Sequence, residues 1–110
     1  MFEIYRGDLI GLPTNENHLV YKWKNPGCKV LFSMTRCGNA ASIHIAADEK
    51  GVFRIRTALN QFSDFIFSGY PWCEMILGKI QNKKLGYIVE RCGFKKIVKT
   101  KDTTAYMRER

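Results

Sequence analysis

The chain has 110 residues, 45% of them hydrophobic and 13% aromatic, which suits one hydrophobic core and predicts a single domain over residues 1–110. No apolar run approaches the roughly 18 residues of a transmembrane helix, and no secretory signal opens the sequence, so we expect a cytoplasmic protein without a membrane partner. The formal net charge of +8 excludes an acidic protein and favours anionic partners.

The first part of the chain favours strands. Residues 2–5 predict a short strand, and residues 6–17 predict a loop because they are rich in Gly, Pro and Asn. The segments 19–23, 30–35 and 41–47 are β-prone and are separated by turn residues. We expect these three segments to pair as an antiparallel meander.

A long amphipathic helix follows the meander. Its predicted apolar stripe recurs at intervals of three and four and consists of Val52, Ile55, Leu59, Phe62 and Ile66. Asp48 is the candidate N-cap, and Gly69 stands where the helix should end. The stripe is typical of a helix face that packs on a core.

The last part of the chain predicts a strand over 72–80, a second helix over 82–91 and a hairpin of the segments 96–100 and 104–107. Gly93 follows the second helix, where a residue able to take a positive φ is favoured. The full order is β, loop, βββ, α, β, α, ββ. This order predicts an α+β fold with a mixed, mostly antiparallel sheet and two main helices.

The order resembles the fold of the GNAT acyl-CoA N-acyltransferases over roughly residues 18 to 110. The closest local similarity lies in the second helix, where Asn82 is followed eleven residues later by Gly93 and Phe94, with Glu90 and Arg91 just before them. This segment is similar to the recurrent N…YEKxGF pattern of the family. The resemblance implies acetyl-CoA as cofactor.

The resemblance also implies where the cofactor would lie. In the family, a Q/R-x-x-G-x-G/A segment at the start of the long helix receives the pyrophosphate. Here Gly51 matches the first glycine, but Asp48 replaces Gln or Arg, and bulky Phe53 replaces Gly or Ala. If CoA binds, the implied contacts are Gly51, Val52, Phe53 and Asn82. The acidic turn also fits a purely structural role at a helix N-terminus.

The catalytic residues implied by the family are incomplete. Many members carry a tyrosine seven residues after the asparagine that opens the second helix, and Val89 stands at that position. Tyr87 lies two residues away, on a different side of the helix. The candidates for a general base are His44 and Glu74. The two helices that normally enclose the acceptor site are replaced by the short loop before residue 18.

These departures favour a catalytically degenerate GNAT-like protein that acts as a binding or assembly module with a protein partner. The chain is also similar to short bacteriophage GNAT-like proteins of the virion or of head assembly, which would place it in the host cytoplasm or the virion. The alternative is an acetyl-CoA-dependent N-acetyltransferase with an atypical cofactor loop.

A third reading concerns the charge. Residues 79–110 contain ten Lys and Arg against three Asp and Glu, whereas the first 78 residues contain eight against seven. This basic third predicts a surface for an anionic partner or a merely solvated face. With Tyr87, Phe94 and Tyr106 interleaved among the cations, stacking on a single-stranded nucleic acid is a further alternative.

The cysteines and histidines show no metal-ligand spacing, so no metal site is predicted. The four cysteines are expected to be buried or partly buried thiols, because no export signal favours disulfides. The two histidines, His18 and His44, lie far apart in the sequence.

Overall fold

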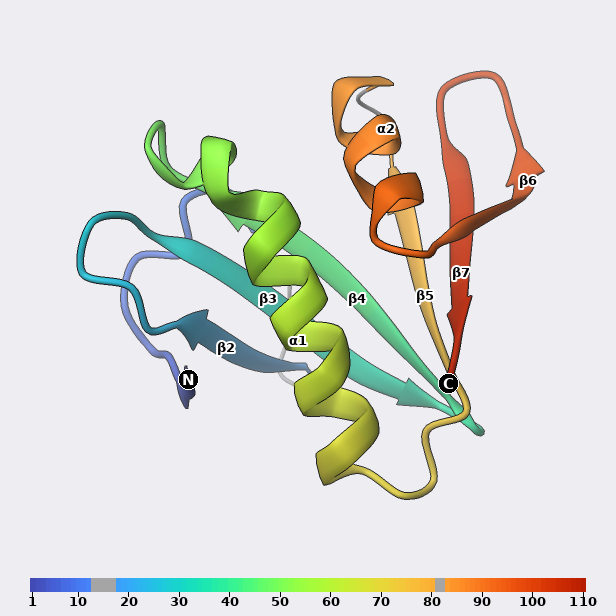
Figure 1. The fold of residues 1–110 in the computed structure, drawn as a ribbon, viewed down its shortest axis with the longest axis horizontal. Helices are drawn as coiled ribbons and strands as arrows, with labels where there is room; N and C mark the ends of the chain where they lie inside the picture. Colours follow the sequence, from blue (N-terminus) through green and yellow to red (C-terminus); the bar gives the residue numbers. More distant parts are fainter. Residues whose placement is uncertain (13–17, 81–82) are drawn as a thin grey trace.

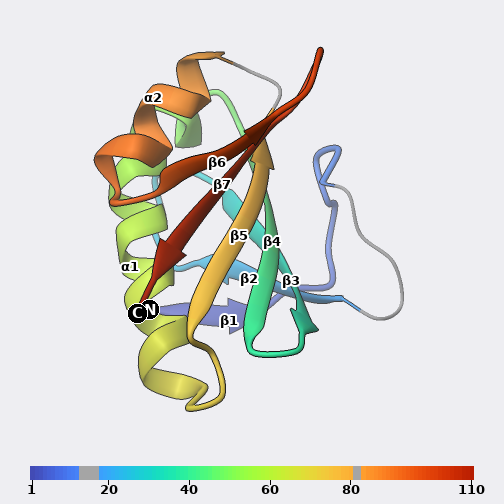
Figure 2. The same ribbon diagram turned by 90° about the vertical axis from the view of Figure 1, so that its right-hand side faces the viewer.

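The computed structural model describes residues 1–12, 18–80 and 83–110, with the side chain of Lys83 left out. The elements in chain order are β1 (Phe2–Ile4), β2 (Leu19–Trp23), β3 (Val30–Cys37), β4 (Ala40–Ala47), the 3-10 helix η1 (Gly51–Arg54), α1 (Ile55–Gly69), β5 (Met75–Ile80), α2 (Lys83–Arg91), β6 (Lys95–Lys99) and β7 (Thr104–Glu109). Both termini lie near the same end of the molecule in one view (Figure 2).

Within these residues the strands form one seven-stranded sheet in the order β1-β2-β3-β4-β5-β7-β6. Neighbouring strands are antiparallel except for β4 and β5, which α1 connects as a crossover and which are therefore parallel. The predicted meander and closing hairpin are both present. The α+β fold with a mixed, mostly antiparallel sheet is confirmed (Figure 1).

Both helices cover the same face of the sheet (Figure 2). The predicted stripe of α1 supplies Ile55, Leu59, Phe62 and Ile66 to the core, each at most 6% exposed. Phe62 stacks on Phe32 of β3 with ring centroids 4.2 Å apart and an interplanar angle of 10°. This contact fixes α1 over the centre of the meander because aromatic pairs of this size bury much apolar area.

The start of α1 differs from its prediction. Val52 was expected on the buried stripe but is 48% exposed, because it belongs to the tighter turn η1 and α1 begins only at Ile55. The Asp48 carboxylate accepts a hydrogen bond from the Gly51 N–H at 2.7 Å within the turn that precedes η1. The N-cap positions are Lys50 for η1 and Arg54 for α1, so the prediction of Asp48 as the N-cap was wrong. A 3-10 turn rotates its side chains differently from an α-helix, which moves Val52 off the stripe.

The strand after α1 is also shorter than predicted. The Cys73 N–H donates to the Tyr70 carbonyl at 2.9 Å and closes a turn, so β5 begins at Met75 instead of residue 72. The end of α2 agrees with the sequence, since Gly93 takes a φ of 87°. The helix described by the structure begins at Lys83, because Asn82 lies outside the described residues.

The four thiols are free, but only two of them are fully buried. Cys73 and Cys92 lie in the core, and Cys28 is partly buried. Cys37 is exposed at the end of β3, where the strand leads into a turn, so the expectation of burial was wrong for this residue.

Among the described helices, none combines the length and apolarity needed to span a membrane.

Candidate functional site

The parallel pair β4 and β5 separates partway along its length. Its register runs from Ala40↔Met75 to Ile43↔Gly78 and then ends, although β4 continues to Ala47 and β5 to Ile80. The two strands diverge beyond this point, as the green and yellow ribbons show (Figure 1). The separation opens the interior of the sheet between α1 and α2.

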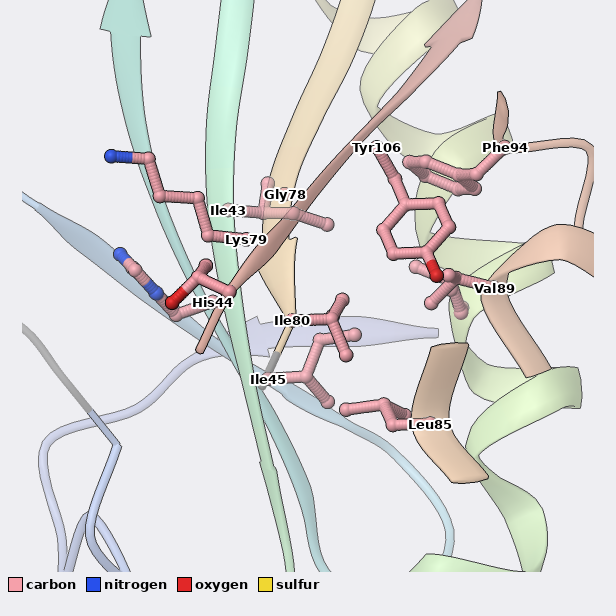
Figure 3. Close-up of a pocket in the computed structure, with 12 residues that line it drawn as sticks. Ile43, His44, Ile45, Gly78, Lys79, Ile80, Leu85, Val89, Phe94 and Tyr106 are labelled. Carbon is pink, nitrogen blue, oxygen red and sulfur yellow. The ribbon is translucent and has the colours of Figure 1, made fainter. Parts of the chain in front are cut away.

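A cavity of about 400 Å³ lies at this separation (Figure 3). Most of its walls are apolar side chains from both strands and both helices. The lining residues that matter here are Ile43, His44, Ile45, Leu59, Gly78, Lys79, Ile80, Leu85, Val89, Phe94, Thr103 and Tyr106. A cavity of this size and polarity is typical of a site for a small organic ligand.

The residues that line the cavity include side chains from both faces of the sheet. Successive strand residues point to opposite faces, so His44 and Lys79 point away from the helices that cover Ile43. Figure 3 shows His44 and Lys79 on one side of the strands, and Val89, Phe94 and Tyr106 on the other. The site therefore has an apolar half under the helices and a polar half on the far face.

The polar half contains a histidine pair. The ring centroids of His44 and His18 lie 6.2 Å apart, although the two residues are distant in the sequence. Burial lowers the pKa of His44, and the neighbouring His18 and Lys79 lower it further. His44 is thus held as a neutral imidazole, which can accept a proton. Among the described residues, no three potential ligands gather as a metal site.

In the turn before α1, groups of the protein itself occupy the position where a cofactor phosphate would bind. The Gly51 N–H donates to the Asp48 carboxylate, and a side chain at Gly51 would overlap the Lys29 carbonyl oxygen. The backbone N–H groups of Lys29 and Gly51 lower the pKa of Asp48, so its carboxylate is charged. The negative charge stands where the resemblance would place a pyrophosphate. Phe53, in the same turn, is 86% exposed.

Glu74 and Tyr87 do not line this cavity. Glu74 precedes β5 at the paired end of the strands, and its carboxylate accepts a hydrogen bond from the Asn39 amide at 2.6 Å. Tyr87 is 71% exposed and lines a separate hollow of about 320 Å³ between α2 and the β6–β7 hairpin. Asn82 cannot be placed because it lies outside the described residues. Of the predicted catalytic candidates, His44 is the one that lines the cavity.

Two residues that line the cavity had been predicted from the sequence to contact a nucleic acid. Phe94 and Tyr106 were grouped with Tyr87 as stacking platforms for a nucleic acid, but they are 4% and 5% exposed and face the cavity. Buried rings cannot stack on bases, so the structure removes two of the three aromatics from that reading. Tyr106 lies in a strand in which apolar and polar residues alternate, and this alternation is the sequence feature that indicates a side chain facing the core.

Comparisons with protein-family models and with curated protein sequences found no match. Similar folds occur among solved structures. A variant of spermidine N-acetyltransferase SpeG from Vibrio cholerae matches with a TM-score of 0.70 and 15% identity, over 86% of this chain and 67% of that one.

The N-acetyltransferase PseH from Campylobacter jejuni matches with a TM-score of 0.70 and 11% identity, over 87% of this chain and 70% of that one. PseH in complex with acetyl coenzyme A matches with a TM-score of 0.65 and 8% identity, over 87% and 70%. Nothing in these comparisons supports the bacteriophage and head-assembly reading, and they fit the enzymatic alternative better. The chain has the fold of the GNAT N-acetyltransferases.

Proposed function

We propose that this chain is an acyl-CoA-dependent N-acyltransferase that transfers an acetyl group to an amine. The observation that carries the proposal is the separation of β4 and β5 after Ile43↔Gly78, with a cavity at that point whose lining includes His44. A two-substrate transfer needs a site that holds donor and acceptor next to each other in a reactive orientation. The similarity to N-acetyltransferases of known structure supports the same reaction class.

The cavity suits the acyl-bearing arm of the cofactor. Beyond Ile43 the edge of β4 has no register partner on β5, and a free strand edge offers backbone N–H and C=O groups to an extended chain that carries amides. The apolar side chains Ile45, Ile80 and Leu85 would surround the aliphatic part. When bound there, acetyl-CoA supplies an acetyl group activated as a thioester.

His44 is the residue to receive the proton of the attacking amine. Its ring lies on the far face of the sheet, and its lowered pKa keeps it neutral near pH 7. An amine is a nucleophile only after it has lost a proton, so a neutral imidazole beside the cavity would assist the attack. Lys79, the residue after Gly78 on β5, adds a positive charge that opposes protonation of His44 and so helps to lower its pKa.

The phosphates of the cofactor fit less well. The resemblance assigns the cofactor contacts to Gly51, Val52 and Phe53, and to Asn82, which lies outside the described residues. The Asp48 carboxylate already uses the Gly51 N–H, and its charge would repel a pyrophosphate. We expect most of the binding free energy to come from the strand cleft.

The test is calorimetric titration with acetyl-CoA and CoA, followed by acetyl transfer to a panel of amines. A Gly78→Leu variant is expected to weaken binding by about tenfold or more, because the new side chain would occupy the cavity. The strand should tolerate it, since a Cβ at Gly78 meets only Ile43 atoms, at 3.9 and 4.0 Å.

The matched control is Gly69→Leu, at the end of α1, where a Cβ has no heavy atom within 4 Å. This variant should bind acetyl-CoA like the unchanged protein. If the unchanged protein binds neither acetyl-CoA nor CoA, the proposed function is wrong. Binding that Gly78→Leu leaves intact would place the cofactor outside the cleft.

A further inference from the structure

An imidazole and an ammonium group flank the point where β4 and β5 separate. His44 and Lys79 are the first residues of the two strands beyond the last registered pair, and both line the cavity. Because successive strand residues alternate between faces, both side chains point to the face that the helices leave uncovered. Figure 3 shows them together on that side. A molecule that enters the cavity from this face therefore meets these two groups first.

The surroundings of Lys79 contain no compensating acid within the described chain. Its partner on β7 is Ala105, which carries no charge. Glu109 has the same face of β7 but lies four residues further along, about 13 Å from Ala105 at the usual rise of a strand. Lys79 is exposed, and the one ion pair of the described residues joins Arg108 to Asp64 at 4.0 Å. The ammonium group of Lys79 is thus available to an anionic ligand.

The lining of the whole cavity has the same bias. Its described residues include His44 and Lys79 but no Asp or Glu. His18 adds a second imidazole, whose ring centroid lies 6.2 Å from that of His44. Both His18 and Lys79 act on the pKa of His44 as positive charges, and burial lowers it further. A cationic compound would therefore be repelled on this side of the sheet.

This positive charge affects an acceptor amine in two ways. An alkylamine has a pKa close to that of lysine, about 10.4, so it reaches the protein with one positive charge. A further positive charge on the acceptor would add to the repulsion by Lys79, whereas an anionic group would be attracted to the ammonium group. A positive charge beside the bound amine also lowers its pKa and favours the free base that attacks a thioester.

We propose that the acceptor is a primary amine that also carries an anionic group, a carboxylate or a phosphate, an assignment that rests on the proposed acyltransferase function. Lys79 binds the anionic group, and His44 receives the proton of the amine. The nitrogen forms a bond to the acetyl carbon, the C–S bond breaks, and CoA leaves as the thiolate. The thiolate then takes a proton from solvent, and His44 returns its proton to solvent.

The first experiment compares acceptors of matched length in acetyl transfer from acetyl-CoA. The assay is run at low salt and about pH 8, where unperturbed histidines are neutral and lysine is charged. The acceptors are 4-aminobutyrate, 3-aminopropyl phosphate, the neutral 4-aminobutanamide and 1,4-diaminobutane. We expect kcat/KM for the better anionic acceptor to exceed that for the diamine by about tenfold or more, with the amide between them. The faster of the two anionic acceptors identifies the group as carboxylate or phosphate.

The second experiment changes the charge at Lys79. Lys79→Gln should reduce the preference for the anionic acceptor to within about threefold, and Lys79→Glu should reverse it in favour of the diamine. Lys95→Gln is the matched control, because Lys95 is an exposed lysine on the same face of the sheet, two strands and about 10 Å from β5. It should keep the preference of the unchanged protein. Thermal unfolding verifies that each variant retains the fold.

The outcomes separate this inference from the proposed function. Fastest transfer to the diamine or the amide, or a preference that both Lys79 variants leave unchanged, would overturn the inference and leave the acyltransferase function intact. No transfer to any of the four acceptors, although acetyl-CoA binds, would also overturn the acceptor class. Absence of acetyl-CoA and CoA binding would overturn the proposed function together with the inference.

Discussion

At the scale of single residues, His44 makes the activity depend on pH in a definite direction. Its pKa is lowered by burial, His18 and Lys79, so the reactive neutral form persists below the ordinary value of about 6.5. We expect kcat/KM of acetyl transfer to stay constant as the pH falls from 7 and to decline only below about 6.5, where the imidazole gains a proton.

Two variants test this assignment in pH profiles of kcat/KM. His44→Gln should lower the rate by about 100-fold and remove the acidic decline. His18→Gln removes a neighbouring charge that lowers the pKa of His44, so it should move the decline to higher pH. A profile that both variants leave unchanged would show that another group is the base.

Asp48 gives a second prediction for a single residue. Its carboxylate stands at the N-terminal turn before α1, where a negative charge opposes the phosphates of a cofactor. Asp48→Asn keeps an oxygen acceptor for the Gly51 N–H but removes the charge, and should tighten acetyl-CoA binding by roughly two- to fivefold at low salt. The measurement is calorimetry at low and high salt, since screening should reduce the gain.

Glu49→Gln is the matched control for Asp48, because it removes the neighbouring exposed carboxylate in the same turn. We expect a smaller gain in affinity from this variant. Equal gains in acetyl-CoA affinity from the two variants would mean that affinity depends on the net charge of the turn and not on the position of Asp48. No gain from Asp48→Asn would place the phosphates elsewhere, for example near the basic hollow beside α2.

At the scale of the elements, the end of α2 depends on Gly93. Its φ of 87° lies in the left-handed region, and the Phe94 N–H returns to the Val89 carbonyl at 3.1 Å. Gly93→Ala should lower the free energy of unfolding by about 1 to 2 kcal/mol, because a side chain is strained at this φ. Urea denaturation measures the change.

Gly69→Ala is the control at the end of the other helix. A Cβ there meets no heavy atom within 4 Å, and its backbone is not in the left-handed region. This variant should be neutral or stabilising by up to about 1 kcal/mol, since alanine is favoured over glycine in helices. Equal effects at the two positions would contradict the role assigned to the φ of Gly93.

At the scale of the whole molecule, the fold itself was predictable from the sequence. The alternation of residues in the meander and the three-and-four spacing of Ile55, Leu59 and Phe62 are local patterns, and each is satisfied by burial against the same core. The turn at Gly93 was predictable for the same reason. The boundary at Val52 was not, because residues 51–54 form a 3-10 turn whose side chains do not continue the apolar stripe of α1.

Local sequence patterns were enough to predict the order of strands and helices and the buried stripe of α1 from Ile55 onward, and they pointed to His44 as a candidate base. The place where β4 and β5 separate, the approach of His18 to His44 and the contact of Tyr106 with Gly86 became visible only in the folded chain. These features depend on strand register and on contacts between residues far apart in the chain. Local secondary-structure propensity does not predict contacts between distant residues, because these contacts form only when distant segments pack on one core.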